Sequence, residues 1–394
     1  MSVSAAVSLR GSAWRVACFG ALVVTSASLG FAQDAENAAT PESTAPPIVV
    51  PEPMGLPAPA AKTDKPYQPQ PILPGGIVIP LYPEGSGKLD QQRINEPERY
   101  NMSSRVHGRI DSIVGIHNPS IELHFASAAM NTGAVVILAA GGGHRTLNVG
   151  GESADFVPFF YNYGVNTAIL RNRLRSDGYN PKTDAVNDAL QSIRLIRKLA
   201  DRWNIDPKKI GIMGFSAGGE LASGAAVLFE AFDNSNNTLG DPLGTFSSRP
   251  DFVCLVYTGG TPFSRNRTPP PLPRNIPPSF VVTAGSGDQS HAVSSMAYFS
   301  AMLEMSLPNI ELHIYGNGRH AGGLADRSDI PFGTWQYRFI DWFRDLGFLQ
   351  KPGVETKAAQ DLKAFLAQPP RPAGGPERRS PAATSGTTAP VCSN

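Results

Sequence analysis

The stretch IGIMGFSAGGELA, residues 210–222, places a serine between an apolar run and a helical pattern rich in small residues. Residues 210–213 predict a buried strand and residues 217–229 predict a helix. Ser216 lies between them, with glycines at 214 and 218, and fits the pattern G-x-S-x-G. A sharp strand-to-helix turn exposes the serine oxygen and needs small neighbours. We therefore predict that Ser216 is a nucleophile, with a purely structural turn as the alternative.

The segments around this stretch predict further strands separated by helices. The predicted strands are 135–139, 166–170, 252–257, 280–284 and 311–315. The predicted helices are 183–204, 292–305 and 334–346. Strands that alternate with helices form a mostly parallel sheet covered by helices on both faces. In such a sheet the site lies beyond the carboxyl ends of the strands.

Two residues at predicted strand ends can serve Ser216 as its base and as the acid that orients the base. Asp288 follows the strand 280–284 and His320 follows the strand 311–315, each after a glycine-rich loop. The chain order serine, acid, histidine is typical of a nucleophile on this kind of turn. We expect His320 to act as the base toward Ser216 and Asp288 to orient His320.

Three other residues compete for these roles. Asp251 precedes its strand, at the wrong edge of the sheet, and His313 falls inside a strand. His291 lies shortly after Asp288 at the correct edge, so it remains an alternative base. For Asp288 itself the alternative is a loop carboxylate or a helix cap.

The loop after the strand 135–139 reads AGGGH, residues 140–144. Glycines let backbone amides approach a substrate oxygen closely. We expect the amides of Gly142 and Gly143, together with that of Ala217, to form an oxyanion hole. His144 either lines the substrate pocket or is a simple loop histidine.

These segments resemble the acetylxylan-esterase-like branch of the α/β-hydrolases, a group of carbohydrate esterases. That branch carries a P-G-G-G-Y loop, an E-G-E-x segment and a G-F-S-A-G-G-H-L-A turn. Here the corresponding residues read AGGGH at 140–144, GGE at 150–152 and GFSAGGELA at 214–222. The resemblance covers roughly residues 113–349.

The resemblance implies the α/β-hydrolase fold and ester hydrolysis, commonly removal of acetyl groups from plant polysaccharide, with no metal or cofactor. It assigns Ser216, Asp288 and His320 to a catalytic triad. The oxyanion donors that it implies are Gly142, Gly143 and Ala217.

The chain departs from the family pattern around the substrate. Ala140 and His144 stand where the family usually has Pro and Tyr, Glu220 replaces the histidine of the serine turn, and Ala321 follows the expected base. These positions surround the acyl and alcohol pockets, so they affect the substrate more than the mechanism. His144 and Glu220 are therefore candidate substrate-binding residues.

The ends of the chain differ in composition from its middle. Residues 1–32 have basic residues, a short apolar core and small residues at the end, which predicts a signal peptide rather than a transmembrane anchor. Residues 33–74 are rich in Pro, Ala, Thr and Glu and predict a disordered linker. Residues 75–350 are the expected catalytic domain, and residues 351–394 a low-complexity tail. We expect a periplasmic or secreted protein with no stable membrane insertion after cleavage.

Charge and cysteine content argue against other classes of protein. The 34 Lys and Arg residues balance 33 Asp and Glu residues without a basic stripe, so nucleic acid is not an expected partner. The three cysteines, Cys18, Cys254 and Cys392, imply no disulfide framework, and Cys254 is expected in a buried strand.

Together these features predict an exported serine esterase that acts on carboxylic esters, with acetylated polysaccharide such as xylan as the leading substrate. Two alternatives stay open. One is a serine hydrolase of small aryl esters or amides. The other is a non-catalytic, hydrolase-like envelope protein.

Overall fold

The computed structural model describes residues 65–236, 242–265, 267–316, 318–320, 324 and 334–369. The predicted signal peptide, Cys18, Cys392 and Ala321 lie outside these residues, as does most of the predicted linker.

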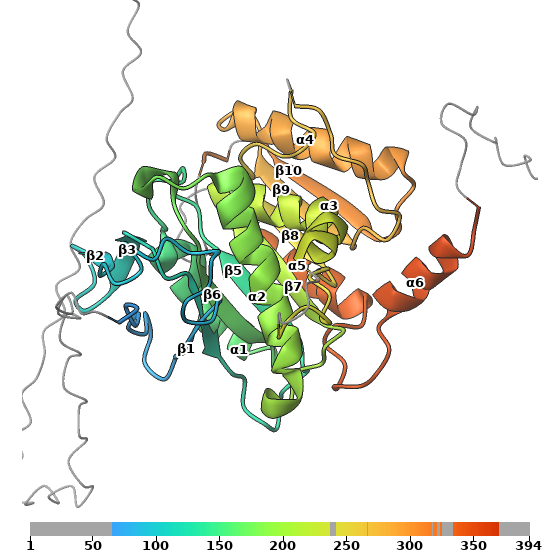
Figure 1. The fold of residues 1–394 in the computed structure, drawn as a ribbon. Coiled ribbons are helices and arrows are strands. Elements are labelled where there is room, and N and C mark those ends of the chain that lie inside the picture. Colours follow the sequence, from blue (N-terminus) through green and yellow to red (C-terminus); the bar gives the residue numbers. More distant parts are fainter. Residues whose placement is uncertain are drawn as a thin grey trace, which may run out of the picture. The chain divides into compact units, whose positions relative to one another are not determined.

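The described residues are built around an eight-stranded sheet with the strand order β1-β4-β6-β5-β7-β8-β9-β10 (Figure 1). Its strands are β1 (Ile77–Pro80), β4 (Ser120–His124), β5 (Val135–Ala139), β6 (Asn166–Arg171), β7 (Ile210–Phe215), β8 (Val253–Val256), β9 (Ser279–Ala284) and β10 (Ile310–Tyr315). Neighbours from β6 to β10 are parallel, whereas β4 is antiparallel to both β1 and β6. A separate two-stranded sheet joins β2 (Arg99–Met102) and β3 (Ile110–Val114). The mostly parallel sheet agrees with the prediction.

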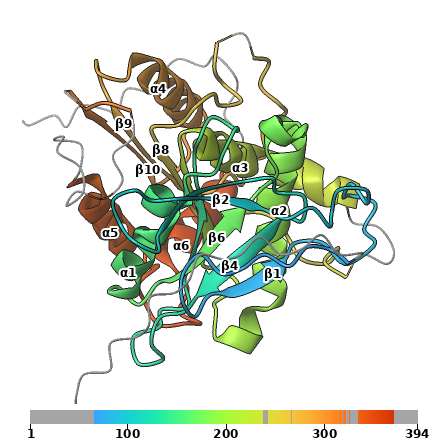
Figure 2. The ribbon, with the colours of Figure 1, turned by 90° about the vertical axis from the view of Figure 1, so that its left-hand side faces the viewer.

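Helices cover both faces of the large sheet (Figure 2). They are α1 (Phe156–Tyr161), α2 (Val186–Lys198), α3 (Ala217–Asn236), α4 (Gln289–Glu304), α5 (Trp335–Asp345) and α6 (Lys357–Leu366). Successive strand residues point to opposite faces, so Val135 and Ile137 pack in one core with α2, α3 and α4. Val136 and Leu138 pack in the other core with α1 and α5. No helix within the described ranges is long and apolar enough to cross a membrane.

The sequence patterns miss the shorter elements. Strands β1 to β4 and helix α1 have four to six residues each, too few for a clear periodicity. The predicted helix 183–204 is divided into a π-helical turn Pro181–Ala185, the helix α2 and a 3₁₀ turn Ala200–Trp203. The run that contains Cys254 forms β8, where this cysteine is buried and free, and burial raises the pKa of its thiol.

The folded domain begins before residue 75, so the predicted end of the linker at residue 74 is wrong. Tyr67 is 7% exposed and Ile72 is 6% exposed. The backbone amide of Ile72 donates to the buried Glu122 at 2.6 Å. Two anchored side chains are enough to fix this segment, although its composition has no apolar periodicity.

The domain also extends beyond residue 350, so the predicted tail starts too early. Residues 351–369 include α6, and the side chain of Thr356 caps this helix by accepting from the Ala359 amide at 3.1 Å. The carbonyl of Lys351 accepts from the buried Lys209 side chain at 3.0 Å. The low-complexity composition belongs only to the residues that follow this helix.

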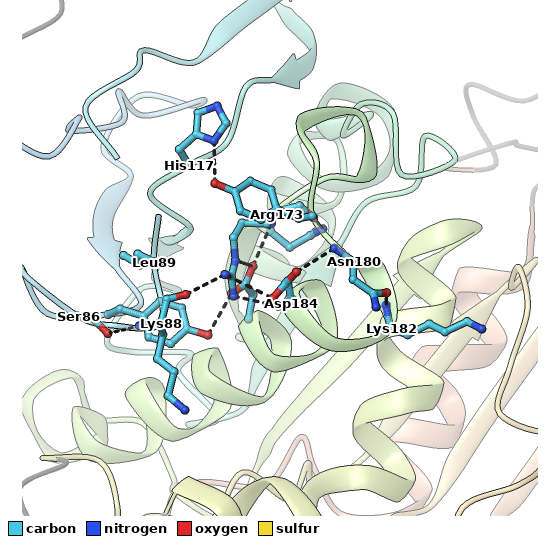
Figure 3. A network of polar contacts seen from close by, with 12 residues as sticks. Ser86, Lys88, Leu89, His117, Arg173, Asn180, Lys182 and Asp184 are labelled. Carbon is cyan, nitrogen blue, oxygen red and sulfur yellow. Dashed lines mark hydrogen bonds and ion pairs between the residues drawn. The ribbon is translucent and has the colours of Figure 1, made fainter. Parts of the chain in front are cut away.

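A buried ion pair ties the end of β6 to the start of α2. The guanidinium of Arg173 lies 2.7 Å from Asp188 Oδ1, and it also donates to the carbonyls of Lys88 and Asp184 (Figure 3). Asp188 is fully buried and accepts a further hydrogen bond from Tyr82 at 3.0 Å. Burial raises the pKa of Asp188, and Arg173 offsets only part of that effect. This pair fixes the chain at the carboxyl edge of the sheet.

Replacing Asp188 with asparagine is expected to lower the free energy of unfolding by about 3–5 kcal/mol, because it leaves the buried Arg173 charge with only the longer, partly exposed contact to Asp184 at 3.7 Å. Urea unfolding measures the loss. The matched control is Asp341→Asn, since Asp341 pairs with Arg344 at the surface with both side chains more than half exposed. The control should change the free energy by at most about 0.5 kcal/mol. Equal effects of the two variants would contradict a stabilising role for the buried pair.

Candidate active site

Ser216 lies on a tight turn between β7 and α3. Its φ is +51°, a left-handed conformation that costs a non-glycine residue about 1–3 kcal/mol. A Cβ on Gly214 would collide with the backbone of Gly218, and a Cβ on Gly218 would collide with the carbonyl of Ala139 in β5. The amide of Ser216 donates to the carbonyl of Val256 at 3.0 Å. Close backbone packing therefore explains both glycines of the motif.

Ser216, His320 and Asp288 form one chain of hydrogen bonds. Ser216 Oγ lies 2.9 Å from His320 Nε2, and His320 Nδ1 lies 2.7 Å from Asp288 Oδ2. Because a carboxylate only accepts, Nδ1 carries the proton toward Asp288 and Nε2 is left to accept from the serine hydroxyl. The His320 side chain is 37% exposed, while Asp288 is buried. This arrangement can move a proton from the serine to the histidine.

The loops after β9 and β10 hold Asp288 and His320 side by side. The two strands are parallel neighbours, and Gly287 and Arg319 extend their pairing by one isolated bridge. A Cβ on Gly287 would collide with the carbonyl of Gly318. The glycines in these loops therefore allow the close approach that brings the two side chains together.

His291 is a second histidine that contacts Asp288. Its Nδ1 lies 2.5 Å from Asp288 Oδ1, and its ring stacks on that of His320 with centroids 3.9 Å apart. Among the described residues, the hydroxyl of Ser216 has a hydrogen bond to His320 and none to His291. The geometry thus favours His320 over His291 as the base, although both contact the same acid.

Asp288, His291 and His320 are also a possible set of metal ligands, because one ligand atom from each lies within 4.8 Å of the others. The same side chains hydrogen-bond to one another and to Ser216. A cation bound there would compete with the proton-transfer chain.

The other rivals lie away from this chain. The amide of Asp251 donates to the carbonyl of Ile210 at 2.7 Å, at the amino-terminal edge of β7. His313 Nε2 lies 2.6 Å from Glu311 within β10. Both residues have structural partners in the sheet, as their sequence positions suggested.

The glycine loop after β5 lies against the serine turn. A Cβ on Gly141 would lie 2.7 Å from the Cβ of the turn serine. Gly142 and Gly143 have φ values of +125° and +63°, which favour glycine. The amide of Gly141 is occupied, because it donates to Glu152 at 2.7 Å. The next donors along the loop are the amides of Gly142 and Gly143, and Ala217 begins α3 beside them.

The two candidate substrate residues, His144 and Glu220, lie together. His144 Nε2 is 3.5 Å from Glu220 Oε1, and Arg267 Nη2 is 3.3 Å from Glu220 Oε2. Burial raises the pKa of Glu220, but the hydrogen bond and charge of His144 and the charge of Arg267 outweigh burial and hold the pKa below its usual value. Glu220 is therefore ionised at neutral pH.

A pocket of about 360 Å³ opens beside Glu220, one helical turn beyond the serine along α3. Its polar lining includes Lys182, Glu220 and Arg267, and its apolar lining includes Val186 and Leu228. Charged donors and acceptors on apolar walls suit a ligand that has both hydroxyl groups and a carbon framework.

Two residues near the site are missed by the sequence interpretation. Tyr257 follows β8 directly, and its ring lies edge-on to His320 with centroids 5.0 Å apart. The rule that sites lie at strand ends could have indicated it. Arg267 lies in a proline-rich loop without a recognisable pattern, so only the tertiary structure shows its contact with Glu220.

The chain is similar in sequence to known proteins. The model of the family described as BD-FAE matches residues 121–250. An acetylxylan esterase of Xylanibacter ruminicola is 27% identical over 231 residues, which are 55% of this chain and 45% of that protein. Endo-1,4-beta-xylanase B of Butyrivibrio fibrisolvens is 28% identical over 198 residues, which are 45% of this chain and 30% of that protein. The chain thus spans less than half the length of either relative.

The chain is also similar to solved structures. An acetyl ester-xyloside bifunctional hydrolase from Caldicellulosiruptor lactoaceticus matches with a TM-score of 0.54 and 24% identity, over 71% of this chain and 99% of that one. This likeness shows a shared fold, the α/β-hydrolase fold, in agreement with the sheet order and the helices on both faces.

Proposed function

We propose that the chain, an α/β-hydrolase similar to acetylxylan esterases, is an exported serine esterase that removes acetyl or other short acyl groups from plant polysaccharide such as xylan. The observation that carries the proposal is the chain of hydrogen bonds from Ser216 through His320 to Asp288. The similarity to an acetylxylan esterase supports the choice of acyl group and polymer.

In the proposed reaction Ser216 Oγ attacks the ester carbonyl while His320 Nε2 takes its proton. Asp288 keeps the other ring nitrogen protonated and stabilises the imidazolium that forms. His320 then gives the proton to the leaving alcohol, and the acyl group stays on Ser216. Water activated by His320 attacks this acyl-enzyme and releases the acid, which restores the serine.

The carbonyl oxygen gains negative charge when the serine attacks, and it needs donors at that moment. In the proposal these donors are the amides of Gly142, Gly143 and Ala217. Each well-placed donor is worth about 3 kcal/mol in the transition state. The positive end of the α3 dipole lies at the same point, because this helix begins at Ala217.

We further propose that the pocket beside Glu220 takes the alcohol side of the ester. Sugar hydroxyls both donate and accept, and the Glu220 carboxylate and the Arg267 guanidinium provide the complementary groups. His144 contacts Glu220 from the glycine loop and links this pocket to the oxyanion donors. Two of the departures from the family motif, His144 and Glu220, thus lie where the substrate alcohol would bind in this proposal.

The export part of the proposal rests on the basic, apolar and small-residue pattern of residues 1–32. It requires that the mature protein begin at Gln33, which amino-terminal sequencing of the exported protein checks.

The substrate is tested by acetate release from acetylated xylan, measured beside aryl acetates, longer acyl esters and anilides. We expect release from acetylated xylan and a fall in rate as the acyl chain lengthens. The variant Glu220→Gln should raise KM for the polymer more than for a small aryl acetate, because only the polymer would fill the pocket.

Other outcomes identify the alternatives. Turnover of aryl esters or anilides without any release from xylan would assign a small-molecule hydrolase. A folded protein that turns over no ester, and that a fluorophosphonate does not label at Ser216, would be a non-catalytic relative.

A further inference from the structure

Glu152 is a buried carboxylate that the proposed reaction does not use. It lies in the π-helical turn Gly150–Ala154 and is 6% exposed. Both carboxylate oxygens accept a hydrogen bond: Oε2 from the Gly141 amide at 2.7 Å and Oε1 from the Tyr257 hydroxyl at 2.9 Å. The two donors come from the carboxyl ends of two different strands, β5 and β8.

The first bond fixes the start of the oxyanion loop. Glycine backbones have wide conformational freedom, so three consecutive glycines do not by themselves hold their amides in one direction. Gly141 is held on both sides, because its amide donates to Glu152 and its carbonyl accepts from the Asn148 amide at 3.0 Å. This anchor restrains the start of the loop that carries the next two amides, those of Gly142 and Gly143.

The second bond fixes a tyrosine against the expected base. Tyr257 is fully buried and has a φ of +37°, an unfavourable conformation for a residue with a side chain. Its ring meets that of His320 edge-on, with centroids 5.0 Å apart and planes at 71°. Glu152 therefore restrains the Tyr257 ring against which His320 packs.

The two partners of Glu152 suit a carboxylate. Both of them donate, which is the arrangement that an ionised carboxylate accepts. Burial raises the pKa of Glu152, while the bonds from Gly141 and Tyr257 and the charge of His320 offset part of this effect. The two hydrogen bonds hold the carboxylate between the glycine loop and Tyr257.

We propose that Glu152 is a positioning residue for ester hydrolysis, which orients the oxyanion loop through Gly141 and holds the Tyr257 ring against His320. The inference rests on the proposed function. Neither role requires Glu152 to touch the substrate.

The test is the variant Glu152→Gln, which keeps the size and one acceptor oxygen and removes the charge. With an aryl acetate as probe we expect kcat to fall about tenfold to hundredfold, with KM changed less than about threefold. A lower kcat at a nearly unchanged KM, in a variant that folds, indicates lost positioning in the transition state rather than lost substrate binding. A residue with a merely structural role would lower the melting temperature without this split.

The chain provides a matched control in Glu98. It is 2% exposed, it accepts from the hydroxyl of Tyr100 at 2.9 Å, and burial raises its pKa as it does that of Glu152. It contacts none of the residues that the proposed reaction uses. Glu98→Gln should therefore leave kcat and KM as in the wild type, even where it lowers the melting temperature.

The results separate the inference from the proposed function. If wild type hydrolyses the probe and Ser216→Ala does not, while folded Glu152→Gln keeps the wild-type kcat, the inference about Glu152 is wrong and the proposed function stands. An equal loss in Glu98→Gln would also overturn it. If wild type itself hydrolyses no ester, the proposed function fails first.

Should Glu152→Gln unfold, the variant Tyr257→Phe replaces it, with Tyr100→Phe as its control. Tyr257→Phe should lower kcat, and an unchanged kcat would count against the inference.

Discussion

Replacing Ser216 with alanine is expected to lower kcat for an aryl acetate by about 10⁶-fold, to the level that binding and the oxyanion donors alone provide. The oxygen that attacks the ester is lost, and no described side chain beside His320 replaces it. The protein should still fold, because alanine keeps the Cβ that Ser216 already holds at a φ of +51°. Steady-state kinetics measures the loss, and the melting temperature confirms folding.

The control for this variant is Ser223→Ala in α3, the helix that follows Ser216. Ser223 is buried, and its hydroxyl donates to the carbonyl of Glu220 at 3.0 Å, away from the reacting atoms. It should retain most of the activity and remain labelled by a fluorophosphonate. Activity retained in Ser216→Ala would rule out the proposed serine mechanism.

Replacing His320 with alanine is expected to lower kcat nearly as far as the serine variant does. His320 is the group whose Nε2 lies 2.9 Å from the serine oxygen, so without it the hydroxyl stays protonated. The double variant with Ser216→Ala should be no slower than either single variant, because the two residues act as one unit. Steady-state rates of the three variants, measured at one pH, check this.

The variant His291→Ala tests which of the two histidines is the base. His291 shares Asp288 with His320 and stacks on its ring, but it has no described hydrogen bond to Ser216. We expect its loss to lower kcat by about tenfold or less, because Asp288 is then held less firmly in its orientation toward His320. If His291→Ala were as inactive as Ser216→Ala while His320→Ala kept its rate, the two histidines would exchange roles.

The strand-end argument works from sequence because it needs only the order and ends of strands. Strands β5 to β10 are short segments of four to six residues that each contain apolar side chains, and parallel strands place their carboxyl ends at one edge. The positions of Ser216, Asp288 and His320 follow from that rule, and their hydrogen bonds agree with it. The same rule places Asp251 at the other edge.

Contacts between loops cannot be predicted from the order of the strands. Both histidines follow strand β9 or β10 at the correct edge, so periodicity cannot rank them. The hydrogen bond from His320 to Ser216, seen only in the tertiary structure, does. Arg267 reaches Glu220 from a loop with no pattern, and Tyr257 and Gly141 meet at Glu152 from separate strands. Such pairs are joined only by the packing of the whole sheet.

The limits of the domain are also predicted only in part from the sequence. Composition separates proline-rich ends from an apolar middle, yet residues 65–74 and α6 pack on the domain through a few anchors such as Tyr67, Ile72 and Ala358. A few buried side chains have too little periodic signal to detect, although each removes apolar surface from water.

For this protein, local pattern determined the parallel sheet, the strained serine turn and the edge at which the chemistry lies, because these depend on near neighbours in the chain. The tertiary structure decided which histidine reaches Ser216, what Glu220 pairs with and why Glu152 is buried. Those contacts join residues far apart in sequence, and their geometry depends on how the strands and helices pack.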